Sequence, residues 1–484
     1  MNWKGISRNI GYALLVSALF MLISAGVAFF GGHDSALAAL SISFVITFIV
    51  GIFPFIFVRK TSAITLKEGF IIITLSWLLS FVFGMLPYAL WGGPFTLTNA
   101  WFESVSGFTT TGATILEDVE ALPKSLLFWR SSTHFIGGLG VVVFLLLIIP
   151  GANQMKMRLA NMELSTLSKS GYSSRSGKTA YIFAYVYLGI CLLATICYTL
   201  AGMPFFDAIC HAMSVCACGG FSTRTASILA FDSRAIELLT MIFMLLASLH
   251  FGLIFLSIVN RSLKPLNNPV LKFYLGSLAV IIIFVGISLK ITGGVETWGL
   301  AFWQSAFQTI STASTTGFAI ADNSHWSLLP NFALLLSGVM CGCAGSTTGG
   351  IKADRVLVLF KAVGCRVNRV LHPTMVNEVK LGKRVLRDDE VAPHVLYISL
   401  YCLILLLSII LSLAFGVNNH SSFAASLSSL SNVGPAIGEL GSLGNFNSLP
   451  VAAKTLYTFD MFLGRVEIYP VLAVVAMIFD RRSR

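Results

Sequence analysis

Four short stretches of this chain begin with a serine and end with a glycine, and small hydroxyl, thiol or amide residues lie between the two. They read SGFTTTG at 106–112, SVCACGG at 214–220, STASTTG at 311–317 and SSLSNVG at 428–434. Glycine adopts backbone conformations that are closed to other residues, and small neighbours keep a passage open. Rings of main-chain carbonyls can replace the water around a dehydrated cation. The pattern therefore indicates cation binding by the backbone.

The candidate ion-binding residues are the last three of each stretch. None of them carries a charged side chain, so coordination by carbonyl dipoles suits an alkali cation better than a divalent cation or an anion. The set is Thr110, Thr111, Gly112, Cys218, Gly219, Gly220, Thr315, Thr316, Gly317, Asn432, Val433 and Gly434.

Two thiols, Cys216 and Cys218, fall in the second stretch and raise the alternative of a metal site. Because no second pair of ligands follows nearby, we interpret them as small wall residues. Their bulk and polarisability leave the fine selectivity of this stretch open. The chain has nine cysteines, an odd number, and several lie in apolar runs, so no disulfide framework is expected.

The spacing of the four terminal glycines indicates a repeated unit. They are 108, 97 and 117 residues apart. Each unit consists of an apolar span, a short helical segment, the glycine loop and a second apolar span. The short segments are expected at 98–108, 207–215, 304–312 and 421–430, with Asp207 and Ser421 as N-caps of two of them. Their partly negative C-terminal ends would favour a cation; the alternative is that the loops are tight turns in helix packing.

The composition places these units in a membrane. The chain has 484 residues, of which 56% are hydrophobic and 11% charged, with a mean hydropathy of +0.83. A membrane-spanning helix needs about 20 apolar residues. We expect ten, two at the N-terminus and two in each unit, and we interpret the first as retained rather than as a signal peptide. They fall at 10–30, 36–58, 69–91, 131–150, 179–206, 238–259, 273–289, 327–340 with its continuation, 395–417 and 456–479.

The net charge of +11 is concentrated in short connecting segments. By the positive-inside rule these segments, and both termini, are cytoplasmic. A nucleic-acid surface is the weaker alternative, because the charges form separate loops rather than one stripe. They include Arg59, Lys60, Lys156, Arg158, Arg366, Arg369, Lys383, Arg384 and Arg481.

Several motifs, in this order and spacing, resemble the Trk/Ktr/HKT superfamily and its bacterial Trk-type potassium uptake branch in particular. They are SGFTTTGAT, CGGFST, TTGFA, CAGSTTGGIK, SNVGPAIGE and FLGRVEI, and the likeness covers nearly the whole chain. The resemblance implies an all-α polytopic membrane protein with four pseudo-symmetric helix–pore loop–helix repeats around one pore, plus two extra N-terminal helices. The corresponding divisions are 1–65 for the extension and 66–155, 156–262, 263–375 and 376–484 for the repeats.

The same resemblance implies a function and partners. It implies potassium, because Gly112 is intact where sodium-selective members commonly carry serine. It also implies a homodimer in the bacterial inner membrane, controlled by a cytosolic nucleotide-binding ring through which ATP, ADP or NAD would act. No phosphate loop, cofactor fingerprint or converging set of acids and bases occurs in this sequence, so no enzyme is expected. A sodium-selective or poorly selective channel or symporter on the same fold is the alternative.

Two features qualify as gates. Arg465 lies inside an apolar span, where an arginine is costly, and the resemblance places it in the pore below the filter; the alternative is an ion pair with Asp460 or Glu467. The run CGCAGSTTGG at 341–350 has poor helix propensity, and the resemblance implies an intramembrane gating loop there; the alternative is a face for close helix packing. The gate residues of this run are Gly342, Gly345, Ser346, Thr347, Thr348, Gly349 and Gly350.

Four further polar residues lie in the apolar part of the chain. His134 and His250 could relay protons, but neither has an acidic neighbour in sequence, so polar packing is expected. Glu103 and His211 occupy corresponding places in two short helices and are expected to stabilise loop geometry. The linker at 352–390 carries nine Lys and Arg and is either a docking surface for an acidic or nucleotide-bearing partner or a lipid-facing basic loop.

Overall fold

The computed structural model describes residues 1–58, 64–148, 176–372, 374, 378–382 and 384–479. Several sequence predictions fall outside these residues, including the unit boundaries at 155/156 and 375/376. The basic residues outside them are Arg59, Lys60, Lys156, Arg158, Lys383 and Arg481.

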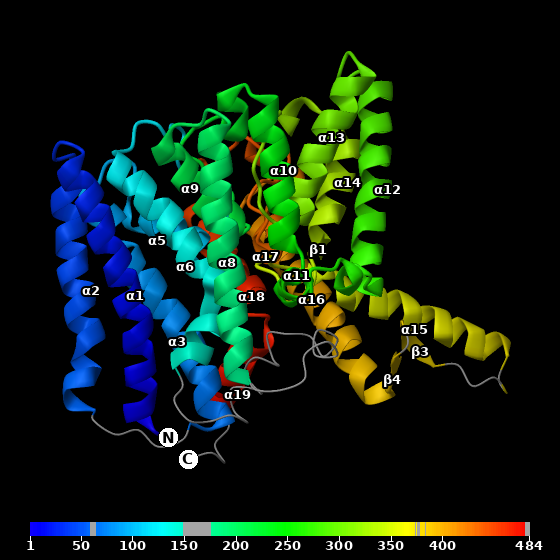
Figure 1. Ribbon diagram of the computed structural model, residues 1–484, viewed down its shortest axis with the longest axis horizontal. Helices are drawn as coiled ribbons and strands as arrows, with labels where there is room; N and C mark the ends of the chain where they lie inside the picture. Colours follow the sequence, from blue (N-terminus) through cyan, green and yellow to red (C-terminus); the bar gives the residue numbers. More distant parts are fainter. Residues whose placement is uncertain (59–63, 149–175, 373, 375–377, 383, 480–484) are drawn as a thin grey trace.

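The N-terminal pair and the first unit form one side of the molecule (Figure 1). The helices are α1 (Trp3–Phe30), α2 (Leu37–Phe57), α3 (Leu66–Gly84), α4 (Leu86–Trp91), α5 (Leu97–Phe108) and α6 (Lys124–Ile148). Helices α1 and α2 approach closely where Gly11 meets Gly51, since neither glycine has a side chain to hold the backbones apart. A Cβ on Gly11 would lie only 2.6 Å from the Gly51 carbonyl oxygen. Thr65 and Glu68 form a capping box that starts α3.

The other three units follow in chain order. The second contains α8 (Ser176–Leu200), α9 (Phe205–Cys216), α10 (Arg234–Ser248) and α11 (Phe251–Val259). The third contains α12 (Pro269–Ile291), α13 (Trp298–Ala313), α14 (Leu328–Val339) and α15 (Ala353–Leu371). The fourth contains α16 (Asp388–Ala414), α17 (Asn419–Ser431), α18 (Val451–Arg465) and α19 (Tyr469–Phe479).

Short elements complete the described chain. Strands β1 (Met340–Cys341) and β2 (Ile351–Lys352) pair in parallel, and β3 (Val379–Leu381) and β4 (Arg384–Leu386) form an antiparallel hairpin. Four short 3₁₀ helices lie in the connections, at η2 (Ser227–Phe231), η3 (Lys264–Leu266), η4 (Asn323–His325) and η5 (Gly438–Leu440).

The all-α polytopic membrane fold expected from the sequence is confirmed. Among the described residues, six helices are long and apolar enough to cross a membrane, or eight if each of two bent helix pairs counts as one span. The bends are 100° between α10 and α11 and 107° between α18 and α19. Helix α14 has 12 residues, about 18 Å, and is too short to cross alone. The second spans of units two, three and four are therefore broken rather than continuous.

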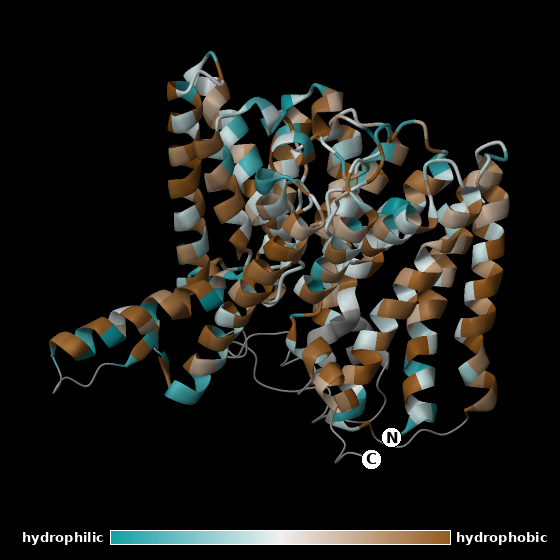
Figure 2. Ribbon diagram, turned by 180° about the vertical axis from the view of Figure 1, so that it is seen from behind, coloured by the Kyte–Doolittle hydropathy of each residue, from teal (hydrophilic) through white to brown (hydrophobic). Residues whose placement is uncertain are grey.

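The outer helices expose apolar side chains, as lipid-facing helices do. Figure 2 shows hydrophobic ribbon along their length and hydrophilic ribbon gathered near their ends. In α2 only 22% of the most apolar window is buried inside the protein, and in α16 the share is also 22%. With water absent from the bilayer core, this exposed apolar surface is compatible with a lipid environment.

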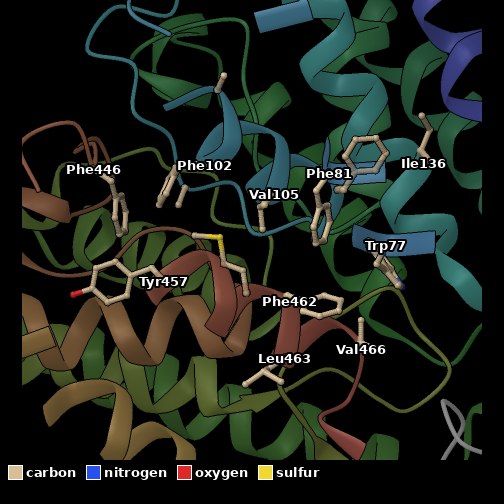
Figure 3. Packing of buried hydrophobic residues seen from close by; sticks show 14 of the residues in the cluster. Trp77, Phe81, Phe102, Val105, Ile136, Phe446, Tyr457, Phe462, Leu463 and Val466 are labelled. Atoms are coloured by element: carbon tan, nitrogen blue, oxygen red, sulfur yellow. The ribbon is translucent and has the colours of Figure 1, made fainter. Parts of the chain in front are cut away.

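The first and fourth units share one hydrophobic core (Figure 3). Phe81 of α3 meets Phe462 of α18 edge to face, with ring centroids 5.7 Å apart. On the other side Phe102 of α5 packs on Phe446, with centroids 5.4 Å apart. Segments more than 300 residues apart in sequence therefore lie side by side, which brings the first and last glycine loops together.

Both expected N-caps are wrong, although the helices exist. Helix α9 begins after Pro204, so Asp207 lies inside the first turn. Helix α17 is capped by Asn418, whose side chain accepts a hydrogen bond from the Ser421 amide. Each helix starts two residues before the predicted cap, because Pro204 has a fixed backbone angle that suits a helix start and Asn418 supplies the capping oxygen of α17.

Candidate functional site

Each of the four short helices ends in a loop with the same backbone hydrogen bond. The amide of the residue before the terminal glycine donates to the carbonyl of the repeated serine, at 2.9 Å in every loop. The four pairs are Thr111 to Ser106, Gly219 to Ser214, Thr316 to Ser311 and Val433 to Ser428. The recurrent serine thus marks the start of a six-residue turn that is built identically four times.

The backbone conformation recurs as well. The residue two before the glycine has φ of 55° at Thr110, 55° at Cys218, 54° at Thr315 and 58° at Asn432. The glycines follow with φ of 81°, 79°, 78° and 93°, while the residue between is not left-handed. The left-handed conformation therefore recurs at two positions of every loop. Such a conformation is costly for residues other than glycine, and it occurs here at four equivalent positions.

The four loops touch one another in a closed circuit. Each glycine lies against the carbonyl oxygen that precedes the glycine of the next loop, so close that a Cβ would stand 2.0 to 2.4 Å from it. The circuit runs from Gly112 to the Gly219 oxygen, Gly220 to the Thr316 oxygen, Gly317 to the Val433 oxygen and Gly434 to the Thr111 oxygen. The structure therefore gathers all twelve candidate ion-binding residues around one axis.

Two cavities lie on the two sides of this circuit. The glycine cavity, about 620 Å³ including its opening, is lined by Gly112, Gly220, Gly317 and Gly434. The loop cavity, about 810 Å³ including its opening, is lined by the intramembrane loop and by Arg465. An ion that passed between the two cavities would cross the ring of loops.

A buried ion pair supports the first two loops from behind. Arg130 of α6 donates to the Glu103 carboxylate at 2.8 Å, and both side chains are at most 2% exposed. The same guanidinium donates to the Ser222 carbonyl at 3.1 Å and lies over the Phe221 ring, 4.0 Å from its centroid. Glu103 also accepts a hydrogen bond from the Ile115 amide, which follows loop one. Arg130 therefore connects the chain after loop one, through Glu103, to the chain after loop two, at Ser222.

Sequence reasoning missed Arg130. The available signal was an arginine at the start of an apolar span, together with a glutamate in the preceding short helix. A buried charge needs a partner, and the pairing of Glu103 with this arginine follows from that rule.

Three buried or half-buried histidines support neighbouring backbone and rings. His134 stacks on Phe221 at 4.1 Å and accepts, through Nδ1, the Phe221 amide at 3.4 Å. The Nε2 of His211 lies 2.9 Å from the Ser222 hydroxyl. His250 caps α11 and accepts the Gly252 amide at 2.9 Å. These contacts agree with polar packing and loop support as the expected roles.

The small-residue run at 341–350 is a loop and not a helix. Helix α14 stops at Val339, the paired strands β1 and β2 close the base of the loop, and helical structure resumes at Ala353. Its tip contacts the second and third glycine loops: the Thr347 hydroxyl donates to the Cys216 carbonyl at 2.9 Å, and the Gly349 amide donates to the Thr315 hydroxyl at 3.1 Å. This intramembrane loop contains all seven predicted gate residues of the run.

Arg465 ends helix α18 at its bend and reaches the same loop. Its guanidinium donates to the Thr347 carbonyl at 2.8 Å and to the Gly137 carbonyl at 2.6 Å. The two acids considered as its partners are engaged elsewhere. Glu467 pairs with Arg355 at 2.5 Å, and Asp460 accepts from Ser408. Arg465 thus links the intramembrane loop to the first unit's second span.

The thiols of the second loop differ in their surroundings. The Thr347 hydroxyl lies 3.2 Å from the Cys218 sulfur, so this side chain faces the intramembrane loop. Cys216 packs in the core of the second unit and is fully buried. Among the described residues, neither belongs to a group of three or more His, Cys, Asp or Glu side chains that could hold a metal ion.

A further tie joins the fourth loop to the first. The Asn432 side-chain amide donates to the Thr111 hydroxyl at 3.0 Å and to the Met461 carbonyl at 2.8 Å. Sequence reasoning included Asn432 only for its backbone. Its amide has two donors, and it directs them to two different elements, the first loop and α18.

The comparisons with known proteins agree over nearly the whole chain. The family described as TrkH, cation transport protein, matches residues 37–482. The Trk system potassium uptake protein TrkH of Salmonella typhimurium is 32% identical over 486 residues, covering 99% of this chain and 100% of that protein. The Trk system potassium uptake protein TrkG of Escherichia coli is 34% identical over 484 residues, covering 98% of each. The crystal structure of the potassium transporter TrkH from Vibrio parahaemolyticus matches with a TM-score of 0.89 and 30% identity, covering 99% of this chain and 100% of that one.

Proposed function

Because this chain belongs to the TrkH family of cation transport proteins, we propose that it takes up potassium across the cytoplasmic membrane through a channel-like pore. Proteins of this family transport cations and are not enzymes. The relatives are named potassium uptake proteins, which supplies the ion of the proposal.

The observation that carries the proposal is the closed circuit of glycine-to-carbonyl contacts. Four loops with one backbone conformation meet around one axis, and none of their twelve candidate ion-binding residues has a charged side chain. A dehydrated potassium ion on this axis would exchange its water for those oxygens. An inside-negative membrane potential drives entry with about 2.3 kcal/mol per charge per 100 mV.

The intramembrane loop and Arg465 are the proposed gate. The loop contacts filter loops two and three from below, and Arg465 adds a positive charge beside it in the loop cavity. Lys352 lines the same cavity and donates to the Thr348 carbonyl. A cation leaving the filter would meet these charges, so opening requires that the loop and Arg465 move aside.

The remaining parts of the proposal concern partners. We take the protein to be a homodimer with both termini in the cytoplasm, regulated by a cytosolic nucleotide-binding ring that would hold ATP, ADP or NAD. Helix α15 and the β3–β4 hairpin belong to the basic linker at 352–390 and extend to one side of the molecule (Figure 1). They are the described segments most suited to meet such a ring.

Flux measurements test the proposal. Purified protein in liposomes should admit rubidium, a potassium substitute, in preference to sodium and without an imposed proton gradient. The substitution Gly112→Ser is expected to increase sodium entry relative to rubidium. Rubidium entry that needs a proton or sodium gradient would make the protein a symporter. A sodium preference in the unchanged protein would favour the alternative of a sodium-selective or poorly selective channel. The feature that supports this alternative is the thiol of Cys218 in the second loop.

A further inference from the structure

A column of buried hydroxyl groups runs through the fourth unit beside a buried carboxyl. Helices α16, α17 and α18 contribute seven hydroxyls and Asp460, and each of these side chains is at most 2% exposed. The hydroxyls belong to Tyr401, Ser408, Ser412, Ser422, Ser426, Ser431 and Tyr457.

The column has three levels, spaced by turns of the helices. At the first level Ser412 lies 3.1 Å from Ser422 and 2.5 Å from Tyr457. One turn along α16, Ser408 lies 2.9 Å from Ser426 and also contacts the Asp460 carboxylate.

The third level lies two turns further along α16. There the Tyr401 hydroxyl is 2.6 Å from Ser431, the residue directly before Asn432 of the fourth filter loop. The column therefore ends at the filter.

Asp460 is the only carboxyl in this column, and no Lys, Arg or His among the described residues lies within ion-pair distance of it. Its hydrogen bond is to one hydroxyl, whereas an ionised carboxylate accepts up to four. A carboxylate buried without a cation carries a large desolvation cost, which a bound proton removes.

The charged and titratable groups on the surrounding helices do not replace that cation. Lys454, on the same helix as Asp460, donates to Asn99 and Asn447 instead, and Glu103 of α5 is paired with Arg130. Arg465 ends the same helix as Asp460 and donates to the Thr347 and Gly137 carbonyls. Other such groups on these helices are Tyr397, Tyr401, Cys402 and Tyr457, His420 at the start of α17, and Asp388, Asp389, Glu390 and His394 at the start of α16.

We propose that Asp460, with Ser408 and Ser426, is a proton-binding site that is coupled to the fourth filter loop. The Ser408 hydroxyl has one hydrogen but contacts two oxygens. With a proton on Asp460, the carboxyl donates to Ser408 and Ser408 donates to Ser426. Without it, Ser408 donates to Asp460 and Ser426 donates to Ser408, so loss of the proton reverses the hydrogen bonds between α16 and α17.

Two connections link this reversal of hydrogen bonds to the fourth filter loop. Helix α17, which carries Ser426, runs directly into Asn432. The carbonyl of Met461, the residue after Asp460, accepts from the Asn432 side chain at 2.8 Å. The binding of a proton here does not depend on the proposed pore, but its effect on conduction rests on the proposed potassium uptake.

Infrared difference spectra of the full-length protein in liposomes test the site directly. Between about pH 5 and about pH 8 the unchanged protein should gain and lose the carbonyl band of a protonated, buried carboxyl. Asp460→Asn should remove that band, and Ser408→Ala should shift it while leaving the carboxyl in place. Glu296→Gln, which changes an exposed carboxyl far from the column in sequence, is the matched control and should leave the band intact.

Rubidium flux over the same pH range tests the coupling. Asparagine resembles the protonated acid, so Asp460→Asn should hold flux at the level that the unchanged protein has at low pH and lose its pH dependence. A spectrum without a pH-dependent band, or a band that survives Asp460→Asn, overturns the site. A flux profile that Asp460→Asn does not alter overturns the coupling, whereas absence of rubidium flux from every variant would refute the proposed function and leave the infrared result standing.

Discussion

The contact between Gly220 and the Thr316 carbonyl offers the sharpest perturbation of the proposed filter. Alanine at this position adds one methyl group. That methyl would stand 2.0 Å from the Thr316 oxygen, which is 1.4 Å short of the 3.4 Å at which ordinary contact begins. The substitution in the second loop therefore pushes one carbonyl of the third loop out of the ring, while the first and fourth loops carry no change.

The size of the effect follows from two terms. A non-glycine residue in a left-handed conformation costs about 1 to 2 kcal/mol, which acts on stability. A displaced carbonyl loses its interaction with the ion; for hydrogen bonds to charged groups such a loss is about 1.5 to 3 kcal/mol. At 1.4 kcal/mol for each factor of ten, conduction should fall about 10- to 100-fold.

A matched control separates the two terms. Gly416 has φ of +85°, close to the +79° of Gly220, but a Cβ there has no neighbour within 4 Å. Gly416→Ala should lower thermal stability by the left-handed term alone, and so by less than Gly220→Ala, and leave rubidium flux intact. Equal flux in the two variants, at equal amounts of folded protein, would refute the argument that the glycines carry the ring.

Three further perturbations address the gate and the support of the loops. Arg465→Ala should raise cation flux at equal expression, because it removes a positive charge and the bond to the intramembrane loop; unchanged or lower flux would contradict the barrier. Deleting Gly345 to Thr348 should leave a constitutive leak in liposome flux, and a deletion that still opens and closes with its regulatory partner would count against the loop as the gate. Arg130→Gln leaves Glu103 buried without its cation and should destabilise the protein by about 3 to 5 kcal/mol. Thermal unfolding in detergent measures this, with Arg366→Gln, at an exposed position of α15, as a control that should change little.

The repeated pattern was sufficient to predict the loops but not how they meet. Serine and glycine at a fixed spacing predicted four equivalent turns, and each is found with the same hydrogen bond and the same two left-handed residues. The circuit of contacts depends on how the units pack around one another. That packing involves pairs such as Phe81 and Phe462, which are too distant in sequence to be paired by any local pattern.

Residues that act through buried contacts were harder to predict. Arg130 lies near an apolar span, but nothing local shows that its guanidinium reaches the chain after two different loops. The N-caps were misplaced because Asp207 and Ser421 are residue types that suit the cap as well as the first turn of a helix, so residue type alone does not fix the first helical position. The break at 341–350 was predictable, since ten consecutive small residues have low helix propensity whatever surrounds them.

The ring of loops is formed by a single polypeptide, and its four quarters differ in sequence. Thr110, Cys218, Thr315 and Asn432 share one backbone conformation, but the two threonines present an alcohol, Cys218 a thiol and Asn432 an amide. In an assembly of four identical subunits any substitution changes four positions together. Here one codon alters one quadrant, so a substitution changes one position of the ring and leaves its three counterparts as they were.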